Sequence, residues 1–383
     1  MVLLHKMKIK PLITVFLTMF GLSLLTVLVM LYSEGWRFNA KGKVLQKTGM
    51  LAIRSTPEGA KVYLNGKIAT ATNDTIPSLT PGTYEIKVEK EGFEVWTKSV
   101  EIFPELVTDI TAVLVSQSPR IEPLTNTGIS LFSLSSSLDK LAYIPINTEK
   151  KGIWVLPLSG APITLFRAGQ NLVAEDTEKY IYSSAENIWW SPDDGELLVQ
   201  LNKEGFYLID IQRQIKEPLE IKDPQEIFSV WELERAKKRK PFLEKQKIGE
   251  DLMVVALDKN TLWSPDEKKF LYLKNYGDVV EIEIYNMEDP LPVGEKRQYS
   301  TYRARKSDLK DIAWYPDSYH LALLEGTTIS LIRIDGTNKT EIFTANGSLA
   351  SDKLFVSPWG DKIIIRASFK QNTLPDLYAV GIR

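Results

Sequence analysis

Aspartate recurs at equivalent positions of this 383-residue chain, and repeated carboxylates can hold metal ions or transfer protons. Asp193, Asp266 and Asp317 each follow proline in a Ser-Pro-Asp or Tyr-Pro-Asp step. The chain supplies little else for such chemistry, because it has no cysteine and only two histidines, His5 and His320. Thiolate zinc sites and cysteine nucleophiles are excluded, and a catalytic triad would have to be built around His320. We therefore assign no catalytic, cofactor-binding or metal-ligating residue.

Other catalytic motifs are also missing. The sequence holds no nucleophile elbow of the Gly-x-Ser-x-Gly type, no zinc-protease helix, no P-loop and no dinucleotide-binding glycine motif. A glycosidase-like pair of carboxylates on loops stays open as an alternative. The 47 basic and 49 acidic residues nearly balance, whereas binding of nucleic acid needs a clustered positive excess. We expect no nucleic-acid partner.

The aspartates belong to an internal repeat. Five ten-residue segments align without a gap: LSSSLDKLAY (134–143), WSPDDGELLV (190–199), WSPDEKKFLY (263–272), WYPDSYHLAL (314–323) and VSPWGDKIII (356–365). Proline fixes φ at a turn, and aspartate or serine hydrogen-bonds the turn backbone, so each segment predicts a strand, a turn and a buried strand. We interpret the repeat residues as structural: Trp190, Ser191, Pro192, Asp193, Trp263, Ser264, Pro265, Asp266, Trp314, Pro316, Asp317, Ser357 and Pro358.

These segments resemble the WD40-like repeats of TolB-type β-propellers, in which a Trp-Ser-Pro-Asp-Gly turn recurs once per blade. WSPDDG (190–195) is the copy that comes near the full motif. Small sheets of three or four strands cannot bury both faces alone, and radial stacking buries them. The resemblance implies an all-β propeller of about five or six blades over residues 118–383.

One long spacing within the repeat contains an expected helical insertion at about 214–250. EIFSVWELERAKKRKPFLEKQKIGEDL (226–252) reads as one or two helices broken at Pro241. The hypothesis of a peripheral insertion predicts that deleting residues 226–250 leaves the propeller intact. Its basic run is either a solvated helix face or a contact for anionic envelope polymer or lipid headgroups, through Arg235, Lys237, Lys238, Arg239 and Lys240.

A second set of strands precedes the propeller. From Gly49 to about residue 117, short runs with apolar residues at every second position predict a small β-sandwich. STPEGAKVYLNGK (55–67) and the later Pro81-Gly82 and Glu91-Gly92-Phe93 resemble the PEGA domain family. We interpret its motif residues as turn residues: Pro57, Glu58, Gly59, Ala60, Asn65 and Gly66. The resemblance implies a surface module of envelope proteins without enzymatic chemistry.

The N-terminal segment predicts a membrane anchor. Residues 11–32, PLITVFLTMFGLSLLTVLVMLY, carry no charge and would span about 33 Å as a helix, enough for a hydrocarbon core of about 30 Å. The run exceeds a signal peptide's apolar region and no small-residue cleavage site follows, which favours an uncleaved signal anchor. Residues 1–10 then form a short cytoplasmic tail bearing lysines, and residues 33–48 a juxtamembrane linker outside the membrane.

Three function classes remain open. The missing catalytic inventory favours a non-enzymatic, membrane-anchored binding or scaffold protein of the cell surface or periplasm, whose propeller contacts a protein or an envelope polysaccharide. A sensor ectodomain is the second alternative, and it would need a membrane partner because about ten cytoplasmic residues are too few for an output domain. A carboxylate-dependent glycosidase is the third.

The topology is directly testable. Protease added to spheroplasts should digest nearly everything beyond the anchor, because residues from about 33 onward are expected outside. Immunoblotting against both ends of the chain would follow the digestion. Full protection of the C-terminal end would contradict the predicted orientation.

Overall fold

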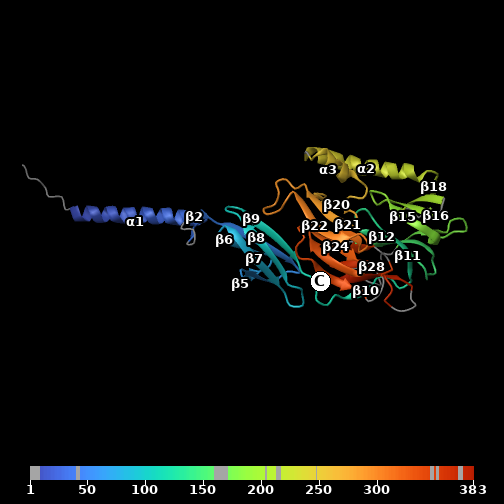
Figure 1. Cartoon of the computed structure of the whole chain (residues 1–383), viewed down its shortest axis with the longest axis horizontal. Coiled ribbons are helices and arrows are strands. Elements are labelled where there is room, and N and C mark those ends of the chain that lie inside the picture. Colours follow the sequence, from blue (N-terminus) through green and yellow to red (C-terminus); the bar gives the residue numbers. More distant parts are fainter. Residues whose placement is uncertain are drawn as a thin grey trace, which may run out of the picture. The chain divides into compact units, whose positions relative to one another are not determined.

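The fold is described from a computed structural model, which describes residues 9–39, 44–158, 171–202, 205–212, 217–246, 248–345, 349–350, 353–369 and 374–383. Most of the expected cytoplasmic tail, residues 1–8, lies outside this part of the chain. The chain divides into two compact units, and Figure 1 labels their elements. Residues 1–90, 95–113 and 292–295 form the first unit, and residues 91–94, 114–291 and 296–383 form the second.

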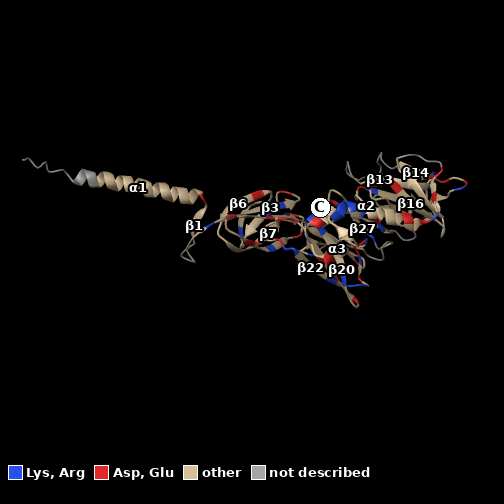
Figure 2. Ribbon diagram, turned by 90° about the horizontal axis from the view of Figure 1, so that it is seen from above, with Lys and Arg blue, Asp and Glu red and all other residues tan. Residues whose placement is uncertain are grey.

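The first unit begins with one long apolar helix, α1 (Ile9–Ser33). Residues 13–33 are long and apolar enough to cross a membrane, and none of this stretch is buried against protein. Figure 2 shows the helix in tan, without acidic or basic residues along its apolar stretch. The segment expected as a linker contains a small hairpin, in which β1 (Trp36–Asn39) pairs with β2 (Val44–Lys47).

The sandwich of the first unit has two sheets. The order β6-β3-β9 makes the three-stranded sheet and β5-β4-β7-β8 the four-stranded sheet. β3 and β9 run parallel, whereas the other pairs are antiparallel. Alternate residues such as Leu51, Ile53 and Val88 are buried between the sheets. The strands are β3 (Gly49–Thr56), β4 (Lys61–Leu64), β5 (Lys67–Ala71), β6 (Asp74–Leu79), β7 (Gly82–Glu89), β8 (Trp96–Ile102) and β9 (Val107–Val113).

The described residues of the second unit form five four-stranded antiparallel sheets, numbered here as blades 1 to 5. Blade 1 comprises β11 (Ile129–Leu134), β12 (Lys140–Pro145), β13 (Gly152–Pro157) and β14 (Asn171–Glu175). Blade 2 comprises β15 (Ala185–Trp190), β16 (Glu196–Leu201), β17 (Gly205–Asp210) and β18 (Leu219–Ile221), preceded by the 3₁₀ turn η1 (Tyr182–Ser184). Blade 3 comprises β19 (Leu262–Trp263), β20 (Lys269–Tyr276), β21 (Val279–Asn286) and β22 (Gln298–Arg305).

Blade 4 comprises β23 (Leu309–Trp314), β24 (His320–Glu325), β25 (Thr328–Arg333) and β26 (Thr340–Thr344). Blade 5 joins the two ends of the unit. It comprises β27 (Leu354–Val356), β28 (Lys362–Ala367) and β29 (Asp376–Gly381), and β29 pairs with β10 (Ile121–Pro123) from the beginning of the unit. The Asp376 carboxylate accepts hydrogen bonds from the Thr125 hydroxyl and the Gly128 N–H, at 2.8 and 2.9 Å. The first strand therefore fastens the last blade, as ring closure of a propeller requires.

The repeat tryptophans link neighbouring parts of the ring. Each stands at the end of an inner strand, β15, β19 or β23, as the repeat predicts. The indole N–H of Trp190 donates to the Ser133 carbonyl of blade 1 at 3.0 Å. Trp314 of blade 4 likewise donates to Leu262 of blade 3 at 2.9 Å. Apolar cores accompany these links, with Ile144 and Val199 buried between blades 1 and 2 and Ile284 and Leu323 between blades 3 and 4.

Two helices occupy the interval between blades 2 and 3: α2 (Pro224–Lys245) and α3 (Glu250–Leu257), yellow in Figure 1. On one side Phe228 packs edge-on against Trp189 of blade 2, with ring centroids 5.3 Å apart. On the other side, Leu243 of α2 and Ala256 of α3 share a core with Phe270 of blade 3. The third repeat tryptophan, Trp263, donates to the Ala256 carbonyl at 2.9 Å rather than to another blade.

Two expectations about the insertion are wrong. It is not peripheral, because its apolar residues share a core with blade 3 and its Phe228 packs on Trp189 of blade 2. Pro241 does not break it, because α2 continues through Pro241 to Lys245. A proline removes one helical hydrogen bond, and the buried side chains of Trp231 and Leu243 on either side of it hold both halves of the helix against the blades.

If the insertion is part of the core, truncating its buried side chain should destabilise the protein. Leu243 is fully buried, so Leu243→Ala should lower the free energy of unfolding by about 2–5 kcal/mol. The matched control is Leu233→Ala on the same helix, where the side chain is 68% exposed and the change should stay within about 0.5 kcal/mol. Urea denaturation followed by tryptophan fluorescence measures both, and equal effects would contradict the packing.

Candidate functional site

The repeat aspartates are held within their own turns. The Asp193 carboxylate accepts hydrogen bonds from the Ser191 hydroxyl at 2.6 Å and the Gly195 N–H at 3.1 Å. Asp266 accepts from the Ser264 hydroxyl in the same way, at 2.5 Å. Ser357 of the last turn donates to Asp361, since Trp359 stands where the three middle turns have aspartate. Pro192, Pro265, Pro316 and Pro358 lie in the corresponding turns between the first and second strands of their blades.

Asp317 holds its turn through a contact with histidine. Its carboxylate accepts from the backbone N–H groups of Tyr319 and His320 and lies 2.7 Å from the His320 Nδ1 atom. Burial by itself would raise the pKa of Asp317. The charge of His320 and these hydrogen bonds outweigh that effect, so the pKa lies below its ordinary value. The residues that invited an acid–base hypothesis are thus occupied in holding turns.

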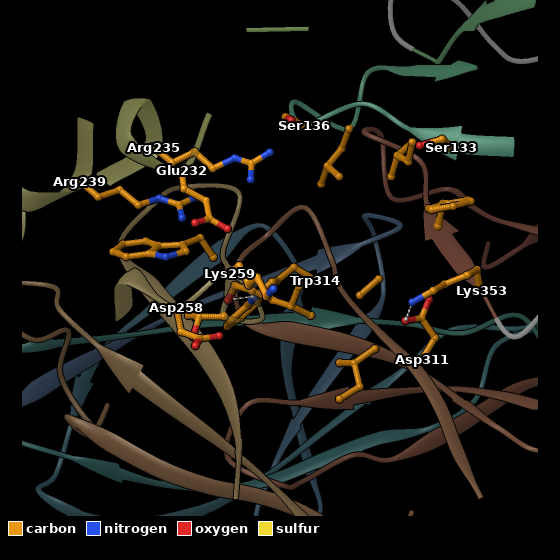
Figure 3. Close-up of a pocket in the computed structure, with 18 of the residues that line it drawn as sticks. Ser133, Ser136, Glu232, Arg235, Arg239, Asp258, Lys259, Asp311, Trp314 and Lys353 are labelled. Atoms are coloured by element: carbon orange, nitrogen blue, oxygen red, sulfur yellow. Dashed lines mark hydrogen bonds and ion pairs between the residues drawn. The ribbon is translucent and has the colours of Figure 1, made fainter. Parts of the chain in front are cut away.

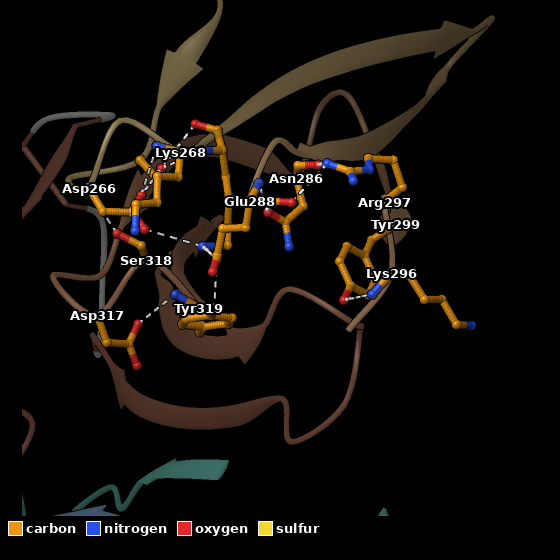
Figure 4. Close-up of polar contacts among 12 residues, drawn as sticks. Asp266, Lys268, Asn286, Glu288, Lys296, Arg297, Tyr299, Asp317, Ser318 and Tyr319 are labelled. Carbon is orange, nitrogen blue, oxygen red and sulfur yellow. Dashed lines mark hydrogen bonds and ion pairs between the residues drawn. The ribbon is translucent and has the colours of Figure 1, made fainter. Parts of the chain in front are cut away.

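A buried polar network joins the turns of blades 3 and 4 (Figure 4). The Lys269 ammonium, which is fully buried, pairs with Asp266 and Glu288 and lies 4.1 Å from the centre of the Tyr319 ring. The Tyr319 hydroxyl donates to Glu288 at 2.7 Å, and the Ser318 hydroxyl accepts from the Asp266 N–H at 3.1 Å. Because the buried ammonium is paired with two carboxylates, this network is a structural link between blades.

The motif residues of the sandwich also lie in turns. Asn65 and Gly66 connect β4 to β5 with positive φ angles of 48° and 78°, as a type I′ turn requires. Pro57 to Ala60 connect β3 to β4, where the Ser55 hydroxyl donates to the Pro57 carbonyl at 2.6 Å. The Glu58 side chain is exposed, and its backbone carbonyl accepts from Lys90.

A cavity of about 1210 Å³ lies along the inner strands of the second unit. Its walls come from four inner strands, β11, β19, β23 and β27, and from α2. Aromatic side chains supply much of the surface: Phe132, Trp263, Trp314 and Phe355. Figure 3 shows charged side chains reaching in from opposite sides. Such a mixture of apolar walls and a few charged groups is typical of ligand-binding cavities.

Helix α2 brings part of the predicted basic run into this cavity. Arg235 and Arg239 line it, one helical turn apart, and Figure 3 shows both projecting from the helix together with Glu232. The Arg239 guanidinium lies 4.7 Å from the centre of the Trp263 ring. Burial lowers the pKa of Arg239 and the nearby Arg235 charge lowers it further, against the opposing effect of Glu267. An arginine nevertheless stays charged at neutral pH.

The other residues of the basic run do not line the cavity. Lys237, Lys238 and Lys240 have exposed side chains. Lys238 pairs with Glu267 at 3.0 Å, and Lys240 lies 4.0 Å from Glu244. The structure therefore divides the run into a cavity face and a solvent face.

The far wall carries a carboxylate that the sequence analysis missed. Asp311 on β23 accepts hydrogen bonds from the Lys353 ammonium at 3.2 Å and from the Leu354 N–H at 3.0 Å. Burial raises the pKa of Asp311, and these two donors oppose that rise. Asp311 and Lys353 are 42 residues apart and belong to no motif, so only the pairing of blades 4 and 5 brings them together.

A further cation comes from the segment between α3 and β19. Lys259 lines the cavity beside Asp258, whose carboxylate accepts from the Asn260 N–H at 2.8 Å. Within the part of the chain that the structure describes, no three histidine, cysteine, aspartate or glutamate side chains are grouped to hold a metal ion. The arrangement is suited to binding a ligand with anionic and apolar parts.

Comparison with known proteins identifies the first sandwich. Residues 48–118 match the PEGA domain family, close to the expected 49–117. The chain therefore contains a PEGA domain. A search among curated proteins found no match.

Solved structures with a similar arrangement include an oligogalacturonate lyase from Vibrio parahaemolyticus. It is 9% identical with a TM-score of 0.34, and the match covers 79% of this chain and 86% of that one. TolB from Acinetobacter baumannii is 13% identical with a TM-score of 0.26, over 84% of this chain and 63% of TolB. Likeness at this level says nothing about ligands or activity, so the function has to be argued from the cavity.

The Asp317 contacts predict a pH-dependent contribution to stability. Because the folded-state pKa is lowered, the contribution is present above the unfolded value of about 3.9 and is lost as the pH falls through the folded value. Asp317→Asn should therefore lower the free energy of unfolding by about 1–3 kcal/mol at pH 7, and by less at pH 3, which lies below the unfolded value of about 3.9. Asp278→Asn, at an exposed position, is the control for urea denaturation at both pH values. An equal loss at both pH values would contradict the assignment.

Proposed function

We propose that this protein is a non-enzymatic, membrane-anchored binding or scaffold protein of the cell envelope, and that the propeller cavity is its binding site. The cavity is the observation that carries the proposal. It is large enough for a segment of a polymer or polypeptide, and it combines aromatic walls with charged groups on two sides.

The apolar helix α1 supports the anchoring. Its stretch from residue 13 to residue 33 lies outside any protein core, so a lipid bilayer is the natural environment for these side chains. The lysine-bearing N-terminal tail is proposed to stay in the cytoplasm, with residues from about 33 onward outside. The PEGA domain fits this placement, because the resemblance to that family implies a surface module of the envelope.

The charges in the cavity support binding rather than catalysis. General acid–base chemistry needs a carboxyl group free to exchange a proton with a substrate. Asp311 already accepts two hydrogen bonds from Lys353 and Leu354, and Asp258 holds its own turn. The partner is proposed to be a protein or an envelope polymer.

One observation favours a second candidate. The raised pKa of Asp311 inside a cavity is a property that glycosidases give to their general acid. Asp311→Asn would abolish hydrolysis of an envelope polysaccharide if that candidate is right. If the protein is a binder, the unsubstituted chain should capture the polysaccharide without releasing any hydrolysis product.

The proposed site is tested by filling the cavity. The full-length chain in non-ionic detergent is used as bait against solubilised membranes and purified wall polymer, with captured material identified by mass spectrometry. Ala236→Trp places a large ring in the cavity and should reduce capture about tenfold or more, whereas Val230→Trp on the same helix does not line the cavity and should not. Equal capture by both variants would show that the cavity is not the binding site.

A further inference from the structure

We propose that the α2 side of the cavity is a binding site for a phosphate ester, held by Arg235, Arg239 and Lys259. This inference rests on the proposed function and adds the chemistry of the ligand. The proposal depends on three features of the site: the placement of the arginines, the absence of partners for the cations, and the position of Glu232.

The two arginines are arranged as a pair. They are four residues apart, so they lie on the same face of α2, and Figure 3 shows both side chains directed into the cavity. Stacking on Trp263 restrains the Arg239 guanidinium before any ligand binds. Holding two like charges this close is unfavourable, and an anion between them would relieve the repulsion.

The cations of this site also make no direct hydrogen bond or ion pair with a carboxylate. Among the residues described by the structure, Arg235 and Lys259 take part in no hydrogen bond or ion pair. Arg239 stacks on Trp263 and feels the charge of Glu267 without forming an ion pair with it. Other lysines nearby are paired: Lys238 with Glu267 outside the cavity and Lys353 with Asp311 on its far wall. Half-buried, unpaired guanidinium groups are costly unless a ligand supplies the oxygen atoms they lack.

The number of donors indicates phosphate rather than carboxylate. A carboxylate presents two oxygens in one plane and satisfies a single guanidinium fork. A phosphate monoester presents three oxygens around a tetrahedral centre and carries nearly two negative charges, which matches two forks and an ammonium. The arginines are half-buried in a cavity, so the ester must belong to a slim molecule or polymer end rather than to the surface of a bilayer.

Glu232 is an acidic side chain beside the two arginines, so its removal should have the opposite effect on phosphate binding. Its carboxylate projects from α2 into the same part of the cavity as the two arginines (Figure 3). Among the described residues it makes no hydrogen bond or ion pair, so its charge opposes an incoming anion without contributing to the fold. Removing this charge should strengthen phosphate binding, whereas removing an arginine should weaken it.

The probe is glycerol 3-phosphate, titrated by isothermal calorimetry into the full-length chain in non-ionic detergent. Arg235→Gln and Arg239→Gln should each weaken binding by about tenfold, since each removes charge-assisted hydrogen bonds. Glu232→Gln should strengthen it by roughly threefold. Lys237→Gln is the matched control, with the same loss of charge at an exposed position of α2 outside the cavity, and should change little. Because Arg239 packs on Trp263, thermal unfolding of each variant checks that the helix is retained.

Three results would overturn the proposal: unchanged binding in Arg235→Gln, an equal loss in Lys237→Gln, or glucuronate binding as tightly as glycerol 3-phosphate. Vesicles with anionic headgroups serve as a further comparison. Binding to vesicles that survives Arg235→Gln and is lost in Lys237→Gln would place the anion contact on the outer face of the helix. If phosphate does not bind but Ala236→Trp still abolishes capture of the partner, this inference fails and the proposed function stands.

Discussion

The hydrogen bond donated by the indole of each repeat tryptophan is the interaction on which the rest of the propeller depends. Trp190 and Trp314 each donate to the inner strand of the preceding blade, so the end of one inner strand fixes the position of the next. Each blade is apolar on both faces and has to pack against a neighbour. A buried indole N–H without an acceptor would cost about 1–3 kcal/mol. Apolar packing and this hydrogen bond therefore both require the neighbouring blade to lie in the same position.

The need of each repeat indole for an acceptor also explains why the insertion shapes the cavity. Between blades 2 and 3 the acceptor for Trp263 is Ala256 of α3, so helices rather than a blade complete this part of the ring. The blades bring mainly apolar and aromatic surface to the cavity, together with the Asp311–Lys353 pair. Helix α2 adds the arginines that carry the proposed ligand chemistry.

Features that follow from local chemistry could be predicted from the sequence. Inner strands end at Trp190, Trp263 and Trp314, and Asn65-Gly66 forms a two-residue hairpin turn, because turn backbones demand particular residue types at fixed spacing. The apolar helix and the PEGA domain follow from composition and motif order. Features that depend on tertiary packing could not be predicted. The continuity of α2 through Pro241 depends on side chains buried on either side, and the Asp311–Lys353 pair forms only when two blades meet.

The central claim, that the propeller cavity contacts the envelope partner, is tested most directly by photo-crosslinking in intact cells. A crosslinking amino acid replaces Leu233, which is exposed and lines the cavity, or Ile68, which is exposed on the PEGA domain. The account predicts a defined crosslinked product, identified by mass spectrometry, from position 233 and none from position 68. Crosslinking from position 68 alone would contradict it and would place the binding function on the PEGA domain.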